Sequence, residues 1–186
     1  MKQNSMKYDP EQVYQPEADT YLLYEAVQAE IRQDDRVIEI GTGSGYIGSH
    51  LSGYGSLVVT DINPHACLAA REAGLEVIRC DLLDGIRGLF DLVIFNPPYL
   101  PTNAEEKIDD WFEYALDGGP DGRLVIKRFV ENVRRIMVPG GRVLLLVSSL
   151  TGVQAVLDLI QKHSFKGEIV AKRQVFDEWL YVIKCH

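Results

Sequence analysis

The residues best suited to chemistry in this chain are four consecutive ones, Asn96-Pro97-Pro98-Tyr99. They follow an apolar run, residues 91–95, that is typical of a buried strand. An amide or ring amino nitrogen is a poor nucleophile because its lone pair is delocalised. The Asn96 side-chain oxygen and the Pro97 carbonyl could accept hydrogen bonds from its two N–H groups and draw the lone pair back onto nitrogen. The run therefore predicts a site that activates a planar –NH₂ group.

The two prolines make this loop rigid before any ligand binds. Proline fixes its own φ and restricts the residue before it, so Asn96 and Pro97 both have few accessible conformations. Tyr99 could stack on the planar group. The alternative interpretation is a strand that merely ends at a Pro-Pro turn, but such a stop requires neither Asn nor Tyr.

A glycine-rich run forms the second feature. Residues 36–40 are typical of a short buried strand, and Gly41-Thr42-Gly43-Ser44-Gly45 follows directly. Glycines after a strand allow a tight turn and let a ligand approach the main chain. The next expected strand ends at Asp61, whose carboxylate could bind two ribose hydroxyls. The G-x-G-x-G spacing differs from that of dinucleotide folds and is a weak signal alone, so Asp61 is what favours a nucleoside.

Three acidic residues fall at or just after the carboxyl ends of successive expected strands, namely Glu39, Asp61 and Asp81. In a doubly wound sheet those ends line one crevice. Three carboxylates would repel a pyrophosphate but attract a ligand that carries a sulphonium and an ammonium group, as S-adenosylmethionine does. The alternative is that each acid only caps the helix that follows its strand. This explains any one of the three acids, but it explains less well why all three occur at the same edge of the sheet.

The apolar periodicity predicts an α/β fold. Helices are expected at 19–31, 44–52, 64–73, 123–136 and 152–163, and strands at 35–40, 57–60, 76–80, 91–95, 142–148, 167–174 and 179–184. Their alternation implies a mostly parallel sheet with helices on both faces. Residues 175–178 are too few for a helix, so the last two strands should form an antiparallel hairpin. Pro139-Gly140-Gly141 should form a tight turn before the fifth strand.

Length and composition favour a single domain, 1–186, because 186 residues with 46% hydrophobic content can bury a substantial core. Residues 1–12 are expected to be flexible, and residues 13–33 to form a helical segment that closes the cofactor site. There is no apolar run of about 18 residues and no secretory leader, so we expect a cytoplasmic protein with no membrane span. The cysteines and histidines are scattered, so we expect no metal.

The charge distribution argues against nucleic acid as the main partner. The formal net charge is −8, and residues 1–120 hold 8 Lys and Arg against 21 Asp and Glu. A duplex-binding enzyme needs a broad basic face. Lys127, Arg128, Arg134 and Arg135 could form a local one. The preferred interpretation is that they are the solvated side of an amphipathic helix.

Together these motifs resemble the class I S-adenosylmethionine-dependent methyltransferases, and within them the HemK-type glutamine methyltransferases that modify peptide-chain release factors. The resemblance runs from Tyr14 to about Lys184 and is carried by residues 14–20, 39–45, 61–63, 80–82, 96–99 and 115–122. It implies a single Rossmann-like domain with a seven-stranded, mostly parallel sheet, a C-terminal antiparallel hairpin and helices on both faces.

The resemblance also implies roles for individual residues. Those expected to bind the cofactor are Thr20 (methionine part), Glu39, Gly41 and Gly43 (shape of the methionine and ribose pocket), Asp61 (ribose hydroxyls), Asp81 and Leu82 (adenine), and also Ile62 and Asn96. Asn96, Pro97 and Tyr99 would handle the acceptor amide. Residues 118–122 look like a loop and helix start that close one wall. A turn followed by a helix N-cap is the preferred interpretation of that run.

The bacterial members carry a separate helical domain before the core, whereas the Tyr-x-Pro motif begins here at Tyr14. This resembles the archaeal and eukaryotic branch, which methylates the glutamine of the Gly-Gly-Gln loop in class I release factors. The resemblance implies a small zinc-binding activator protein as partner. Alternatives that remain open are a nucleic-acid adenine N6-methyltransferase, a protein lysine methyltransferase and a non-catalytic binding subunit.

Overall fold

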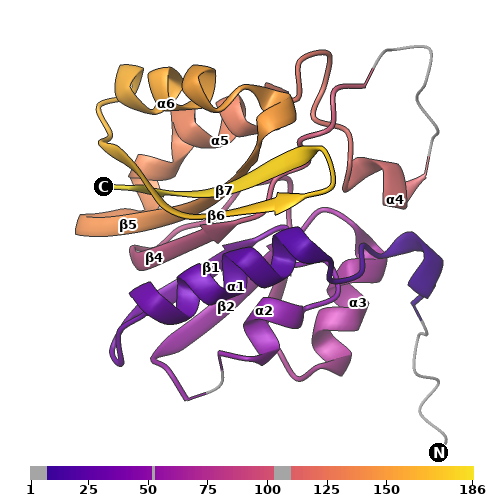
Figure 1. The fold of residues 1–186 in the computed structure, drawn as a ribbon. Helices are drawn as coiled ribbons and strands as arrows, with labels where there is room; N and C mark the ends of the chain where they lie inside the picture. The colour runs from indigo at the N-terminus through magenta and orange to yellow at the C-terminus, as the bar shows by residue number, and fades with distance from the viewer. Residues whose placement is uncertain (1–7, 52, 103–109) are drawn as a thin grey trace, which may run out of the picture.

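The computed structural model describes residues 8–51, 53–102 and 110–186. Its centre is a seven-stranded sheet in the order β3-β2-β1-β4-β5-β7-β6 (Figure 1). The strands are β1 (Arg36–Ile40), β2 (Ser56–Asp61), β3 (Val77–Arg79), β4 (Phe90–Phe95), β5 (Met137–Ser148), β6 (Gly167–Val175) and β7 (Glu178–Cys185). All seven predicted strands are therefore confirmed.

Helices cover both faces of the sheet, as the alternation predicts. They are α1 (Ala18–Glu30), α2 (Tyr46–Ser49), α3 (Pro64–Glu72), α4 (Trp111–Tyr114), α5 (Leu124–Val133) and α6 (Val153–Lys162), with 3₁₀ turns η1 (Pro10–Gln12), η3 (Arg134–Ile136) and η4 (Ser149–Thr151). Figure 1 shows α1, α2 and α3 on one face and α5 and α6 on the other. Among the described residues, no helix combines the length and apolar composition needed to span a bilayer.

Two hydrophobic cores lie on either side of the sheet, and successive strand residues alternate between them. Val37 belongs to the cluster that contains Leu23 of α1, whereas its neighbour Ile38 belongs to the cluster that contains Phe129 of α5. The alternation follows because successive side chains of a strand point to opposite faces. Buried on both faces, the central strands position whatever follows their carboxyl ends.

The strand order reverses between β1 and β4, which both run parallel to their neighbours. In open α/β sheets, ligands bind at this topological switch point, beyond the carboxyl ends of the strands. On the far side, β7 pairs antiparallel with both β5 and β6. The predicted C-terminal hairpin is confirmed, and its turn consists of Phe176 and Asp177.

Two predictions about local structure are wrong. Pro139-Gly140-Gly141 lies inside β5, where Met137 pairs with Phe90 and Arg142 pairs with Leu92. Because five positions along β5 match only two along β4, the extra residues form an irregularity in the strand, with Gly140 at φ +78°. The helix expected over 44–52 is reduced to α2, since Gly45 adopts φ +80° and delays its start. Its expected last residue, 52, lies outside the described residues.

The N-terminal segment expected to be flexible is only partly described, because residues 1–7 lie outside the described ranges. The Asp9 main-chain N–H donates to His65 Nδ1 at 3.0 Å. The main-chain carbonyl of Gln12 accepts a hydrogen bond from Asn63 Nδ2 at 2.6 Å. The side-chain Oε1 of Gln12 accepts one from the Trp111 N–H at 3.0 Å. Residues 9–12 are thus attached to the starts of α3 and α4.

Candidate functional site

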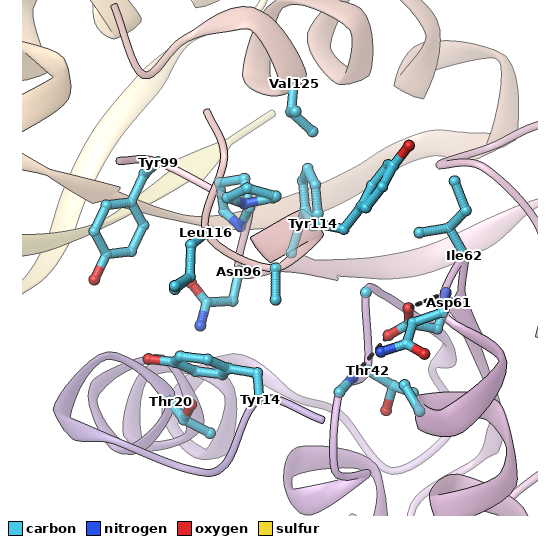
Figure 2. A pocket seen from close by; sticks show the side chains of 18 of the residues that line it. Tyr14, Thr20, Thr42, Asp61, Ile62, Asn96, Tyr99, Tyr114, Leu116 and Val125 are labelled. Atoms are coloured by element: carbon cyan, nitrogen blue, oxygen red, sulfur yellow. Dashed lines mark hydrogen bonds between the residues drawn. The ribbon is translucent and has the colours of Figure 1, made fainter. Parts of the chain in front are cut away.

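A cavity of about 640 Å³ lies beyond the carboxyl ends of β1, β2, β3 and β4, beside the switch point. All residues that sequence analysis assigned to the site line it: Thr20, Glu39, Gly41, Gly43, Asp61, Ile62, Asp81, Leu82, Asn96, Pro97 and Tyr99. Figure 2 shows Tyr99 and Asp61 on opposite sides of the view with Asn96 between them. The structure therefore brings the predicted nucleoside and acceptor residues into one space.

Asp61 ends β2 and is fixed by main-chain donors on both of its carboxylate oxygens. Its Oδ2 accepts from the Gly43 N–H at 2.9 Å, and its Oδ1 accepts from the Asn63 N–H at 2.9 Å (Figure 2). Burial raises the pKa of Asp61, and these main-chain hydrogen bonds oppose that rise. Since each oxygen has two acceptor positions, the carboxylate can still accept hydroxyl donors from the cavity.

Glu39 lies behind the glycine-rich loop and is almost completely buried. Its Oε2 accepts from the Thr42 hydroxyl at 3.0 Å and from the Gly48 N–H at 3.1 Å. Burial raises the pKa of Glu39 to about 8. In addition to lining the cavity, this side chain therefore ties the loop to the first turn of α2.

Asp81, expected to contact adenine, forms an ion pair with Arg128 of α5 at 2.7 Å. Arg128 also lines the cavity. The interpretation of the basic residues as a purely solvated helix face is incomplete. Arg134 donates to the Ser164 carbonyl at 2.8 Å, and Arg135 donates to main-chain carbonyls between β3 and β4. These arginines are exposed, yet they are engaged within the protein.

The orientation of Asn96 is fixed by a buried acid from α1. Asn96 Nδ2 donates to Asp19 Oδ2 at 3.0 Å, and the Tyr14 hydroxyl donates to the same oxygen at 3.0 Å. Because a carboxylate only accepts, it selects the –NH₂ side of the Asn96 amide. Figure 2 shows the Asn96 side chain projecting toward Tyr14 and Thr20.

The carbonyl side of the Asn96 amide is left open by this arrangement. Asn96 Oδ1 is buried and has no hydrogen-bond partner. Most buried polar atoms are paired, so an unpaired acceptor in a cavity requires an explanation. The arrangement leaves an acceptor directed at a ligand donor, as the chemistry of the Asn-Pro-Pro-Tyr run predicts.

Two tyrosines lie beside this acceptor. Burial raises the pKa of both Tyr14 and Tyr99, and the negative charge of Asp19 raises them further. Both phenols therefore remain neutral. Tyr99 is available as a neutral aromatic surface for a planar group.

Residues 114–117 form the wall of the cavity next to this loop, and the glycines that follow hold the loop in place. The Leu100 N–H donates to the Leu116 carbonyl at 3.0 Å, and the Gly118 N–H donates to the Leu100 carbonyl at 2.9 Å. A Cβ atom on Gly122 would lie 2.4 Å from the Tyr99 carbonyl oxygen. Only a residue without a side chain permits this approach.

The expectation for residues 118–122 is half right. The run forms a turn, as predicted, with the Asp121 carboxylate accepting from the Arg123 N–H at 3.0 Å. The N-cap of α5 is Arg123, however, and it makes no side-chain capping bond. The glycines serve the close contact with Tyr99 instead.

Several cavity-lining residues were missed by the site assignment, namely Tyr14, Asp19, Tyr114, Leu116, Val125, Arg128 and Glu178. Tyr14 and Asp19 stand inside the Tyr14–Thr20 motif, which is the signal that could have revealed them. Leu116 lies within the 115–122 motif, and Arg128 belongs to the basic group already noted. The remaining three come from segments without a distinctive pattern. Across the described ranges, no group of three or more His, Cys, Asp or Glu side chains is arranged to hold a metal ion.

Comparison with known proteins shows to which family this chain is related. The family described as "Methyltransferase small domain" matches residues 15–113. A Methanocaldococcus jannaschii protein named "Putative protein N5-glutamine methyltransferase" is 38% identical, over 96% of this chain and 93% of that one. The human "Methyltransferase HEMK2" is 31% identical, over 92% of this chain and 88% of that one.

A solved relative agrees in both sequence and structure. A chain of the E. cuniculi Mtq2–Trm112 complex superposes with a TM-score of 0.80 and 33% identity, over 94% of this chain and 98% of that one. That complex is described as responsible for the methylation of the eRF1 translation termination factor. The chain therefore belongs to the methyltransferase small-domain family and, within it, to the HemK-type protein N5-glutamine methyltransferases.

Proposed function

We propose that this protein transfers the methyl group of S-adenosylmethionine to the side-chain amide nitrogen of a glutamine in a class I translation release factor. The observation that carries the proposal is Asn96 Oδ1, a buried acceptor without a partner, fixed by Asp19 and lining the same cavity as the nucleoside-binding carboxylates. The family relationship and the names of the relatives support the same acceptor chemistry.

The cavity fits S-adenosylmethionine. Its volume of about 640 Å³ falls within the range of roughly 300–1,000 Å³ that is usual for small-molecule sites. Asp61 would accept the ribose hydroxyls, Asp81 and Leu82 would contact the adenine, and Thr20 would contact the methionine part. Of the three acids expected to attract a cationic ligand, Asp61 and Asp81 contribute negative charge, and that of Asp81 is shared with Arg128. Glu39 keeps its proton at neutral pH, because burial raises its pKa to about 8, and it serves to hold the glycine-rich loop. When bound, the cofactor supplies an electrophilic methyl group.

The acceptor amide is activated by two fixed acceptors. Asn96 Oδ1 and the Pro97 carbonyl take one N–H each, which concentrates the lone pair on nitrogen. Tyr99 stacks on the planar amide and holds it in line for transfer. With the cofactor bound, the new carbon–nitrogen bond would form as the carbon–sulphur bond of the donor breaks, and the nitrogen would release one proton afterwards. Because the proton leaves only after the nitrogen has become cationic, no side-chain base is required to remove it first.

The two alternative acceptors fit the structure less well. A duplex substrate requires phosphate contacts, whereas Arg128, Arg134 and Arg135 are engaged in contacts within the protein. The side-chain ammonium group of a lysine is tetrahedral and cationic at neutral pH. Acceptors that are placed for a flat –NH₂ group would therefore activate it little. The side-chain amide of a glutamine is planar and uncharged, and a peptide substrate needs no contacts to phosphates.

A small partner protein is part of the proposal, because the E. cuniculi relative is solved as a complex with Trm112. The resemblance adds the expectation that this partner binds zinc. The pairing is tested by co-expression and gel filtration with the corresponding small protein. Co-elution supports it, and separate elution contradicts it.

The substrate is tested by methyl transfer from radiolabelled S-adenosylmethionine. The acceptors are a class I release factor, the same factor with the glutamine of its Gly-Gly-Gln loop replaced by alanine, duplex DNA and a lysine-rich histone-tail peptide. Each is assayed with and without the small partner. We expect label on the unaltered release factor alone. Label on DNA or on the lysine peptide, with none on the release factor, would overturn the assignment.

A further inference from the structure

Two side-chain oxygens of the cavity are buried and lack a hydrogen-bond partner, among the lining residues that the structure describes. One is Asn96 Oδ1, which the proposed function uses, and the other is Glu178 Oε1. No motif in the sequence singles out Glu178, and the proposed transfer step does not need it.

The position of Glu178 is set by the C-terminal hairpin. Glu178 begins β7 and pairs with Val175 across the two-residue turn. The next main-chain N–H, that of Trp179, donates to Ser149 Oγ at 3.0 Å and so ties the start of β7 to η4. The Cα position of Glu178 is therefore held by contacts on two sides.

Glu178 belongs to the acceptor end of the cavity. The start of β7 is bonded to Ser149 of η4, and Thr151 of the same turn lies against Gly122, which packs on the Tyr99 carbonyl. Glu178 and Tyr99 line the same cavity, and the charge of Glu178 contributes to the raised pKa of Tyr99. Asp61 and Asp81, the residues proposed to bind the nucleoside, lie at the end of β2 and just after β3, on the other side of the sheet order from β7. A polypeptide that delivers a glutamine to Asn96 thus has its main chain close to Glu178.

A buried carboxylate oxygen without a donor is costly, because it has lost water and gained no hydrogen bond. A carboxylate can only accept, so the missing partner must be a donor. The acceptor protein is the molecule that enters this end of the cavity in the proposed function. We propose that Glu178 accepts a hydrogen bond from an N–H group of the acceptor protein next to the methylated glutamine, and so contributes to acceptor specificity.

This inference rests on the proposed function and names a substrate contact of the same site. The N–H donor has two possible sources: the main chain beside the glutamine, or a neighbouring Lys or Arg side chain. Two variants separate them. Glu178→Gln keeps a neutral acceptor oxygen but removes the charge, whereas Glu178→Leu removes both. Glu168→Leu is the matched control, since Glu168 is an exposed carboxylate on β6 of the same hairpin.

The experiment measures kcat and KM for a release-factor peptide and the Kd for S-adenosylmethionine. For Glu178→Leu we expect KM for the peptide to rise about tenfold or more, as for the loss of a hydrogen bond to a charged group. The Kd for the cofactor and kcat should change less than about threefold. Glu168→Leu should match the wild type.

The donor is identified with altered peptides. A main-chain donor predicts that an ester in place of the peptide bond next to the glutamine raises KM for the wild type but adds nothing in Glu178→Leu. A cationic donor predicts the same pattern when the neighbouring Lys or Arg is replaced by Ala, together with a clear loss in Glu178→Gln. Either pattern supports the contact.

An unchanged KM in Glu178→Leu, while the wild type methylates the peptide, would overturn the contact and leave the proposed function intact. An equal rise of KM in Glu168→Leu, or a weakened cofactor Kd in Glu178→Leu, would also overturn it, because the effect would then be general or structural. A wild type that does not methylate the glutamine peptide would overturn the proposed function and this inference together.

Discussion

The two ends of the central sheet treat buried polar groups in opposite ways. At the amino end, Arg142 is buried and its Nη groups donate to both oxygens of Asp35 at 3.2 and 2.5 Å. At the carboxyl end, Asn96 Oδ1 and Glu178 Oε1 are buried without a hydrogen-bond partner. Arg142 Nε also makes no hydrogen bond, but it lies 3.8 Å from Glu30 Oε2 in an ion pair. Arg142 at the amino end thus faces partners of opposite charge, whereas the two unpartnered oxygens at the carboxyl end belong to residues that line a cavity.

The partner of a buried polar group distinguishes structural residues from functional ones more clearly than its degree of burial does. Asp35 and Asp19 are both almost fully buried acids. Asp35 pairs with an arginine, whereas Asp19 accepts from Asn96 and Tyr14 and thereby directs another side chain into the cavity. An acid of the first kind should affect folding when it is altered, and one of the second kind should affect chemistry.

The largest expected effect is on stability, in Arg142→Met. This change leaves the Asp35 carboxylate buried without its partner, so the free energy of unfolding should fall by about 3–5 kcal/mol. Urea denaturation followed by circular dichroism measures it. Replacing Asp35 by Leu in the same chain should recover much of the loss. A single variant within about 1 kcal/mol of the wild type would contradict the comparison.

At the opposite end of the sheet, Asn96→Ala should affect activity. Removing a fixed acceptor for the reacting group should lower kcat by about 10²–10³-fold, while the Kd for S-adenosylmethionine and the stability stay nearly unchanged. Single-turnover transfer and calorimetry measure both quantities. Asn132→Ala, at an exposed asparagine of α5, is the control that should retain full activity. Unchanged transfer in Asn96→Ala would exclude the amide mechanism.

Replacing Glu39 by Gln should have an intermediate effect on the free energy of unfolding, and this effect should depend on pH. Because burial raises its pKa from 4.5 to about 8, the folded protein holds a proton that the unfolded chain has released. The stability that this proton provides is complete below the unfolded pKa and is lost as the pH rises through the folded pKa. Between about pH 5.5 and about pH 7, the wild type should lose roughly 2 kcal/mol relative to Glu39→Gln. Parallel stability curves for the two proteins would show that Glu39 is not the source.

The smallest expected effect is that of Arg128→Met, which tests an Arg–Asp pair of similar length at an exposed position. The side chains of Arg128 and Asp81 are 48% and 39% exposed, against 5% each for Arg142 and Asp35. Water therefore screens the exposed pair, and its removal should cost less than about 1 kcal/mol of unfolding free energy. A loss as large as that of Arg142→Met would show that burial does not explain the difference.

The sequence was sufficient for the sheet and for the main parts of the site. Apolar runs such as Val37–Ile40 identify strands because each central strand is buried on both faces. The Asn96 acceptor follows from the chemistry of four adjacent residues. The start of β5 was misjudged because Pro139 and Gly140 are typical of turns, and only pairing with β4 shows that they lie within a strand.

Contacts between distant residues could not be predicted in this way. Asp19 and Asn96 are 77 positions apart, and neither local periodicity nor charge pattern links them. Glu178 ends a hairpin turn in which any polar residue would be acceptable. Its place in the cavity depends on β7 lying beside β5, which is a property of the folded sheet.

A crystal structure of the protein with S-adenosylhomocysteine and a glutamine peptide would show whether Asn96 and Pro97 bind the acceptor amide. We expect the amide nitrogen within about 3 Å of both Asn96 Oδ1 and the Pro97 carbonyl oxygen, with Asn96 Nδ2 still hydrogen-bonded to Asp19. A glutamine whose carbonyl oxygen faces Asn96 instead, or which binds outside this cavity, would contradict the claim.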